Sequence, residues 1–171
     1  MKSKQAEKLH QAGNGPGIPD LARLVSQCRS KPAFLSGLAE IYEQVEAELA
    51  DYHCRCMGGG VCCRFDLVEH RLFVSTGELA LLTSEPPPAP EACRKMRCPY
   101  QLGPKCSARD RRPLGCRIFF CRPDEGNSPQ GTYEEYHRRI RSLHQTHWVP
   151  YGYAELTSSI MQLSLAEQVT C

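Results

Sequence analysis

The sequence predicts a mainly α-helical protein with a cysteine-rich, irregular metal-binding lobe and small β pieces. Apolar residues recur every three or four positions on both sides of the chain's centre, as they do along one face of a helix. The centre lacks this periodicity and holds nine of the eleven cysteines among glycines, prolines and arginines. Thiols gathered on short, turn-rich segments generally bind metal or form disulfides.

We expect a flexible N-terminal tail over residues 1–19 and a single domain over residues 20–171. The tail is charged at its start and then rich in glycine and proline. Asp20 is a good N-cap for a first short helix. Pro32 suits the first turn of a longer amphipathic helix, which we expect over 32–52.

Further helices are expected within the centre and beyond it. Ser75 and Glu78 form a capping-box pattern that opens a brief helix. Thr132 begins a second such pattern, which predicts a helix over 132–147. A last amphipathic segment predicts a helix over 153–169.

Composition disfavours several functional classes. The formal net charge is +2, and no apolar run approaches the roughly 20 residues that span a bilayer. The charged N-terminus has no apolar core behind it, so we expect no secretory signal and a cytoplasmic location. A reducing compartment favours metal or redox chemistry over structural disulfides, and the odd number of cysteines favours the same.

The cysteine region, residues 53–123, offers two groups of metal ligands. The expected ligands are Cys54, Cys56, Cys62 and Cys63 in the first group and Cys98, Cys106, Cys116 and Cys121 in the second. The sequence contains no Cys-x-x-Cys pair, which disfavours zinc fingers and thioredoxin-like sites. Eight thiolates can hold two zinc ions, one four-cysteine iron–sulfur cluster with spares, or one of each. Ligand softness does not separate these cofactors.

At these residues the chain resembles the YkgJ-type cysteine-cluster family, described as a zinc- or iron-chelating domain. The first family motif is a run of cysteines that ends in an adjacent pair. It stands here as CRCMGGGVCCR, from Cys54 to Arg64. The family has two-residue gaps in this run, whereas here one residue separates Cys54 from Cys56 and five separate Cys56 from Cys62.

The second family motif matches more closely. It stands here as Cys98-Pro99-Tyr100, then Cys106, then Arg112-Pro113-Leu114-Gly115-Cys116-Arg117, then Cys121. The resemblance covers roughly residues 53–123 and implies a bound metal, either zinc or iron. A similar cysteine pattern occurs in flagellin lysine methylases, which look like iron–sulfur proteins.

Two arginines of the second motif are expected to support the ligands. Arg112 and Arg117 can donate to a cysteine sulfur or to a backbone carbonyl, which would orient the ligands and tune the metal. The alternative for Arg117 is a simple pair with a surface acid. The excess of basic residues between Cys93 and Arg122 would also offset the negative charge of a thiolate–metal unit.

Other metal-ligating residue types are expected to have other roles. His53 adjoins the cysteine region and could replace a cysteine. His144 and His147 have a spacing that can bind metal on a helix, but packing or surface roles are more common there. Cys93 has no counterpart in the family motif, and Cys28 is expected to be a buried apolar residue.

The sequence therefore favours a metal-binding protein that holds zinc or an iron–sulfur cluster, in a structural or electron-transferring role. The first alternative is an iron–sulfur or zinc enzyme of redox or group-transfer, methyl-transfer-like type. It is disfavoured because no phosphate loop, Ser/His/Asp set or catalytic carboxylate pair can be identified. The second alternative is a nucleic-acid-binding zinc protein, disfavoured by the near-neutral charge and the missing finger spacings. No protein partner is indicated.

Overall fold

The computed structural model describes residues 18–50, 59–68, 71–118 and 130–169, and the structural statements below refer to them. The α-helices are α1 (Ile18–Arg29), α2 (Pro32–Ala50), α3 (Phe65–Val68), α4 (Thr76–Leu82), α5 (Leu114–Ile118), α6 (Gln130–Thr146) and α7 (Leu156–Val169). The 3-10 helices are η2 (Val61–Cys63), η3 (Pro90–Lys95) and η4 (Arg109–Arg111), and the strands are β1 (Phe73–Ser75), β2 (Gln101–Leu102), β3 (Lys105–Cys106) and β4 (Tyr153–Glu155). The predicted fold class, mainly helical with small β pieces, is confirmed.

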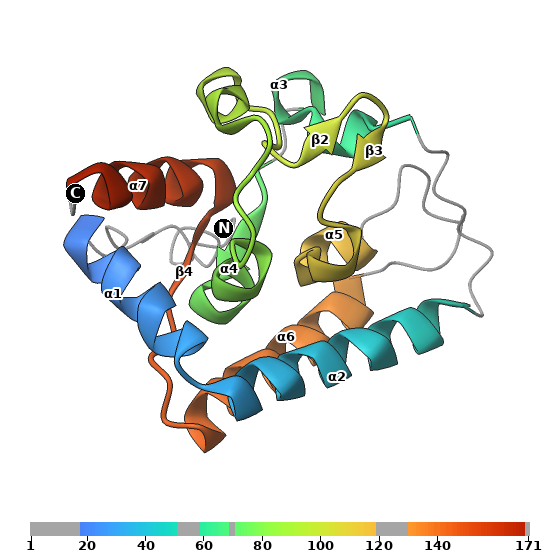
Figure 1. Cartoon of the computed structure of the whole chain (residues 1–171). Coiled ribbons are helices and arrows are strands. Elements are labelled where there is room, and N and C mark those ends of the chain that lie inside the picture. Colours follow the sequence, from blue (N-terminus) through green and yellow to red (C-terminus); the bar gives the residue numbers. More distant parts are fainter. Residues whose placement is uncertain (1–17, 51–58, 69–70, 119–129, 170–171) are drawn as a thin grey trace, which may run out of the picture.

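The helices pack around two adjoining apolar clusters (Figure 1). In one, α1 packs against α4 and α7. In the other, α2 and α6 lie side by side, and the short α5 packs against both. Helix α2 contributes to both clusters, with Phe34 in the first and Leu38 in the second. The two clusters are therefore joined through one continuous helix.

The long predicted helices are present, with corrected ends. Phe34, Leu38 and Val45 are buried along one face of α2, as their spacing predicts. The predicted tail extends too far, because residues 18–19 belong to the first turn of α1, where a proline is tolerated. Asp20 therefore lies inside this helix and is not its N-cap. The predicted end of the second helix, residues 51–52, lies outside the described residues.

Two further predictions about helix starts are wrong. Helix α6 already begins at Gln130, so Thr132 is not its cap, and the Thr132 hydroxyl donates to Glu48 of α2 at 3.4 Å. The predicted helix 153–169 begins only at Leu156, because residues 153–155 pair with β1 as an antiparallel strand. In the second place a long-range strand pairing replaces the first turn of the predicted helix.

The capping box at the start of α4 is confirmed, and its carboxylate has a wider role. The Ser75 hydroxyl accepts the Glu78 N–H at 3.2 Å, and Glu78 Oε2 accepts the Ser75 N–H at 2.8 Å. Glu78 Oε1 also accepts the Leu114 N–H at 2.8 Å and the Tyr42 hydroxyl at 3.4 Å. The buried Glu78 thus joins α4 to α2 and to the first residue of α5. Within the described ranges, no helix combines the length and apolar character needed to cross a bilayer.

We expect Glu78→Ala to lower the free energy of unfolding by about 3 kcal/mol or more, because it strands buried donors from three elements. Urea denaturation monitored by circular dichroism measures this change. Glu43→Ala, on an exposed position of α2, is the matched control and should stay within about 0.5 kcal/mol of the wild type. Equal stability of the two variants would contradict the structural role of Glu78.

Candidate metal centre

Five of the eight predicted ligands are described by the structure. We call Cys62, Cys63, Cys98, Cys106 and Cys116 the five thiols. They come from separate short segments: η2, the turn after η3, β3 and α5. The other predicted ligands, Cys54, Cys56 and Cys121, lie outside the described residues, as does the alternative ligand His53.

A backbone hydrogen bond joins the two cysteine motifs. The Cys98 N–H donates to the Cys63 carbonyl at 2.9 Å. On one side of this bond, η2 begins after Gly60, whose φ of 66° favours glycine. The Gln101 side-chain amide donates to the Gly60 carbonyl at 3.0 Å, and a Cβ on Gly60 would lie 2.5 Å from that amide nitrogen. The last glycine of the first motif is therefore required by a left-handed turn and a close approach.

The small hairpin places Cys106 next to the same segment. In the register of β2 and β3, Gln101 pairs with Cys106, and Gly103 with a φ of 58° lies in the connecting turn. The Ser107 N–H donates to the Tyr100 carbonyl at 2.9 Å, which extends the pairing by one step. Tyr100 itself is buried and anchors the hairpin to the core. The geometry thus brings the predicted ligands of the second motif back toward Cys98.

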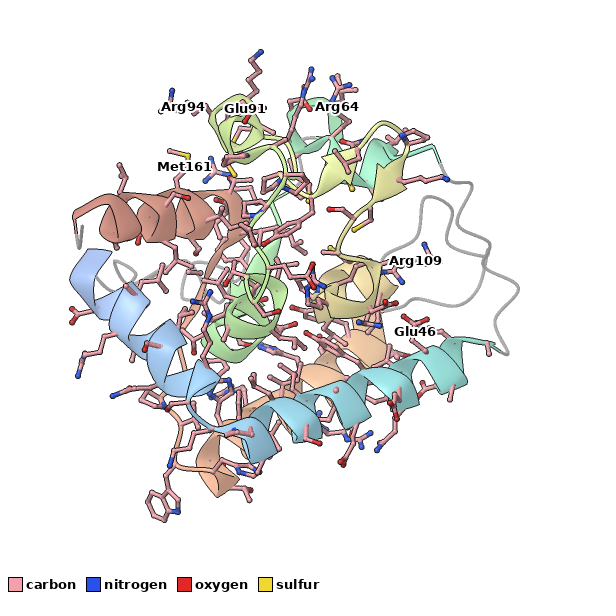
Figure 2. All side chains as sticks on the ribbon, in the orientation of Figure 1. Glu46, Arg64, Glu91, Arg94, Arg109 and Met161 are labelled. Carbon is pink, nitrogen blue, oxygen red and sulfur yellow. The ribbon has the colours of Figure 1, made fainter. Side chains whose placement is uncertain are left out.

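The thiols interact with one another electrostatically. A hydrogen bond with Cys62 lowers the pKa of Cys63, but the hydrogen bond with Cys98, burial and the charges of Cys98 and Cys106 raise it to about 12. Burial first, and then the charges of Cys63, Cys106 and Cys62, raise the pKa of the Cys116 thiol well above its usual range. Sulfur atoms gather between the β2–β3 hairpin and α5 in Figure 2. The five thiols therefore share one region of the molecule.

The five thiols do not form a complete metal site among the described residues. In the segments that the structure describes, no group of three His, Cys, Asp or Glu side chains has the geometry of a formed metal site. The donor chemistry nevertheless suits both zinc and iron–sulfur units, for which thiolate is the preferred ligand. The residues present therefore fit such a group in kind, and the five thiols suffice in number for one four-ligand unit.

The two predicted supporting arginines contact the backbone that carries the second motif. Arg117 is buried and donates to the carbonyls of Asp110 at 2.6 Å and Arg112 at 2.8 Å. It also pairs with Glu46 of α2 at 2.6 Å and lies over the Tyr42 ring, 4.1 Å from its centroid. This is more than a simple pair with a surface acid, because one guanidinium ties a backbone turn to a helix.

Arg112 reinforces the same connection. It donates to the Arg109 carbonyl at 3.0 Å and to Glu46 at 3.2 Å. Glu46 and Arg109, labelled in Figure 2, lie on the side of the molecule where α5 faces α2. The charge of Arg112 also lowers the pKa of Cys116, although burial outweighs this effect. The arginines thus fix the turn between Cys106 and Cys116.

The remaining candidates have packing contacts. His144 is buried, its Nδ1 lies 3.2 Å from the Val149 carbonyl oxygen, and burial lowers its pKa. The rings of His144 and His147 pack against Phe34 at centroid distances of 4.7 and 6.0 Å. Cys93 is buried in the first apolar cluster, and burial raises its pKa to about 11.

The partners of Arg112 and Arg117 on α2 are not apparent in the sequence. Glu46 and Tyr42 are four residues apart on α2, so a helical spacing could have placed them on one face. No comparable local pattern relates Glu46 to Arg112 and Arg117, which lie 66 and 71 positions further along the chain.

No protein-family model, curated protein or solved structure matches this chain. The resemblance to the YkgJ-type family therefore rests on the motif residues alone, and membership stays a prediction.

We expect Arg117→Met to destabilise the protein by about 3 kcal/mol, because it leaves two backbone carbonyls and a glutamate without their donor. Arg117→Lys keeps the charge but not the planar set of donors, and should recover only part of that loss. Chemical denaturation gives the magnitudes, and hydrogen exchange should show faster exchange in residues 109–118.

Arg138→Met is the control for this loss. Arg138 is exposed on α6 and pairs only with Glu135 one turn away among the described residues. Surface pairs of this kind contribute about 0–1 kcal/mol. If Arg117→Met were as mild as the control, Arg117 would have no anchoring role.

Proposed function

We propose that this protein binds metal through the cysteine region, as zinc or as an iron–sulfur cluster, with a structural or electron-transferring role. The observation that carries the proposal is the gathering of the five thiols from separate segments. Cys63 and Cys98 are 35 positions apart, yet a backbone hydrogen bond fixes their segments together. Burial and mutual repulsion disfavour an isolated group of thiolates, and a bound cation would reverse both effects.

The short elements that carry or adjoin Cys62, Cys63, Cys98 and Cys106 support a structural role. Helices η2 and α3 and the strands β2 and β3 are each two to four residues long. Apolar side chains here remain outside the core, such as Val61 at 49% and Leu102 at 53% exposure. Phe65 and Tyr100 beside these elements are buried, but elements this short still gain stability readily from metal ligation, because ligand binding contributes directly to folding.

Of the five thiols, one lies on the packed helices α1, α2, α4, α5, α6 and α7, which we call the helical frame, and the others lie on the short segments. Cys116 lies on α5, which Glu78 and Arg117 hold at its two ends. Cys63, Cys98 and Cys106 belong to the short segments joined by the hydrogen bond between the two motifs. Metal bound by both groups would fasten the short segments to the helical frame. An iron–sulfur cluster would supply electron transfer in addition, whereas zinc would supply ligation alone.

Cys116→Ser should lower the metal bound per chain by more than about half and lower the melting temperature, since it removes a ligand from the rigid side of the site. Elemental analysis of protein purified without oxygen measures the metal. Cys93→Ser is the matched control, because Cys93 is a buried cysteine of the same stretch that is not among the proposed ligands. Wild-type metal content in Cys116→Ser would refute the proposed site.

The visible absorption spectrum separates the two cofactors. An iron–sulfur cluster should give broad visible absorption together with acid-labile sulfide, and mild oxidation should bleach it. Stoichiometric zinc should give a colourless protein, whose short segments unfold before the helical frame when a chelator is added. Oxygen-free protein that contains neither metal in stoichiometric amount would contradict the proposal.

A further inference from the structure

A solvent-connected cavity of about 290 Å³ lies beside the cysteine segments. Its lining residues are Arg64, Ala92, Arg97, Cys98, Gln101 and Gly103. They come from three places: the residue after η2, η3 with its following turn, and the β2–β3 hairpin. The volume is close to the lower limit for small-molecule sites, roughly 300 Å³.

Asp66 holds two arginines of this cavity together. Arg64 donates through Nε and Nη2 to the two carboxylate oxygens of Asp66, each at 2.9 Å. Arg97 donates through Nε to Asp66 at 3.2 Å. The Asp66 N–H donates to the Met96 carbonyl at 2.9 Å, which fixes α3 against the turn that precedes Arg97. Asp66 thus holds the guanidinium groups of Arg64 and Arg97, which are distant in sequence, at one wall of the cavity.

Arg64, Asp66 and Arg97 together keep a net positive charge, and most of the guanidinium N–H groups do not donate to Asp66. The hydrogen bond from Arg64, aided by Arg97, lowers the pKa of Asp66 to about 2, so one negative charge faces two positive charges. Each guanidinium has five N–H groups, and Asp66 accepts hydrogen bonds from only three nitrogens: Nε and Nη2 of Arg64 and Nε of Arg97. The side chains of Arg64 and Arg97 are 29% and 41% exposed, so the other N–H groups can meet a ligand.

The surroundings favour an anion. Arg94 and Lys95 at the end of η3 and Lys105 on the hairpin are exposed nearby in the fold. Figure 2 places Arg64 and Arg94 at the same end of the molecule, where Glu91 also lies. Basic residues around a concave site raise the local concentration of anions. Planar guanidiniums bind carboxylate and phosphate groups in preference to other anions, because their paired donors match two oxygens.

We propose that this cavity binds a small molecule carrying a carboxylate or phosphate group, held by Arg64 and Arg97. The proposal rests on the two guanidiniums and the cavity, and does not need the metal. Because Cys98 forms part of the wall, the anion would lie beside the proposed metal centre, and this consequence does depend on the proposed function.

Isothermal titration of the full chain with inorganic phosphate and with succinate, at constant ionic strength set by sodium chloride, tests the proposal. We expect saturable 1:1 binding of at least one probe, and the better probe identifies the preferred group. Arg97→Gln should weaken that binding by about tenfold or more, the loss expected for one charge-assisted pair of hydrogen bonds. Arg64→Gln should weaken it similarly, and circular dichroism checks that both variants fold.

Arg94→Gln is the matched control, because it removes the same charge from an exposed neighbour that does not line the cavity. Its affinity should stay within about twofold of the wild type. Absence of binding by both probes overturns the proposal, as does equal weakening by Arg94→Gln and Arg97→Gln. Metal analysis of the same samples keeps the two proposals apart: anion binding without metal refutes only the metal site, and metal without anion binding refutes only the anion site.

Discussion

The buried carboxylate of Glu78 is the interaction on which the arrangement of the helices around the cysteines depends. It accepts hydrogen bonds from Ser75, Leu114 and Tyr42, which belong to the start of α4, the start of α5 and the middle of α2. A buried carboxylate is costly unless its oxygens are satisfied, so these elements must meet at one place. The position of α5 follows from that requirement, and with it the position of Cys116.

Arg117 completes the constraint at the other end of α5. Its guanidinium reaches the backbone on the far side of the turn and the Glu46 carboxylate on α2. A helix of five residues has little stability of its own, because nucleation is unfavourable. Here polar contacts at both termini and burial of Leu114 and Ile118 hold it. The segment is thus rigid on the side of the helical frame, whereas the hairpin and η2 contribute few core residues.

The sequence predicts those features that depend on local pattern. The apolar face of α2 and the Ser75–Glu78 capping box are correct because helical spacing and capping involve residues within one turn. The start of α7 is predicted incorrectly because strand pairing between β1 and β4 joins residues about 80 positions apart. The motif residues that the structure describes do come together, but the motif contains no sign of Glu46, Glu78 or Asp66. Glu78 and Asp66 also have local partners, Ser75 and Arg64. The contacts that join separate elements, such as Glu78 to Leu114, Asp66 to Arg97 and Glu46 to Arg117, lie far apart in the chain, and a single sequence does not specify them.

The hydrogen bond between Cys98 and Cys63 also has a kinetic consequence. Together with the bond from Asp66 to Met96, it closes a loop of more than 30 residues that includes β1, α4 and η3. Closing a loop of that length costs about 3 kcal/mol of chain entropy before any contact at its base is gained. Within this loop, α4 packs against α1, so part of the loop is ordered by contacts away from its base. During folding, the two cysteine motifs should therefore meet late, after the helices have assembled.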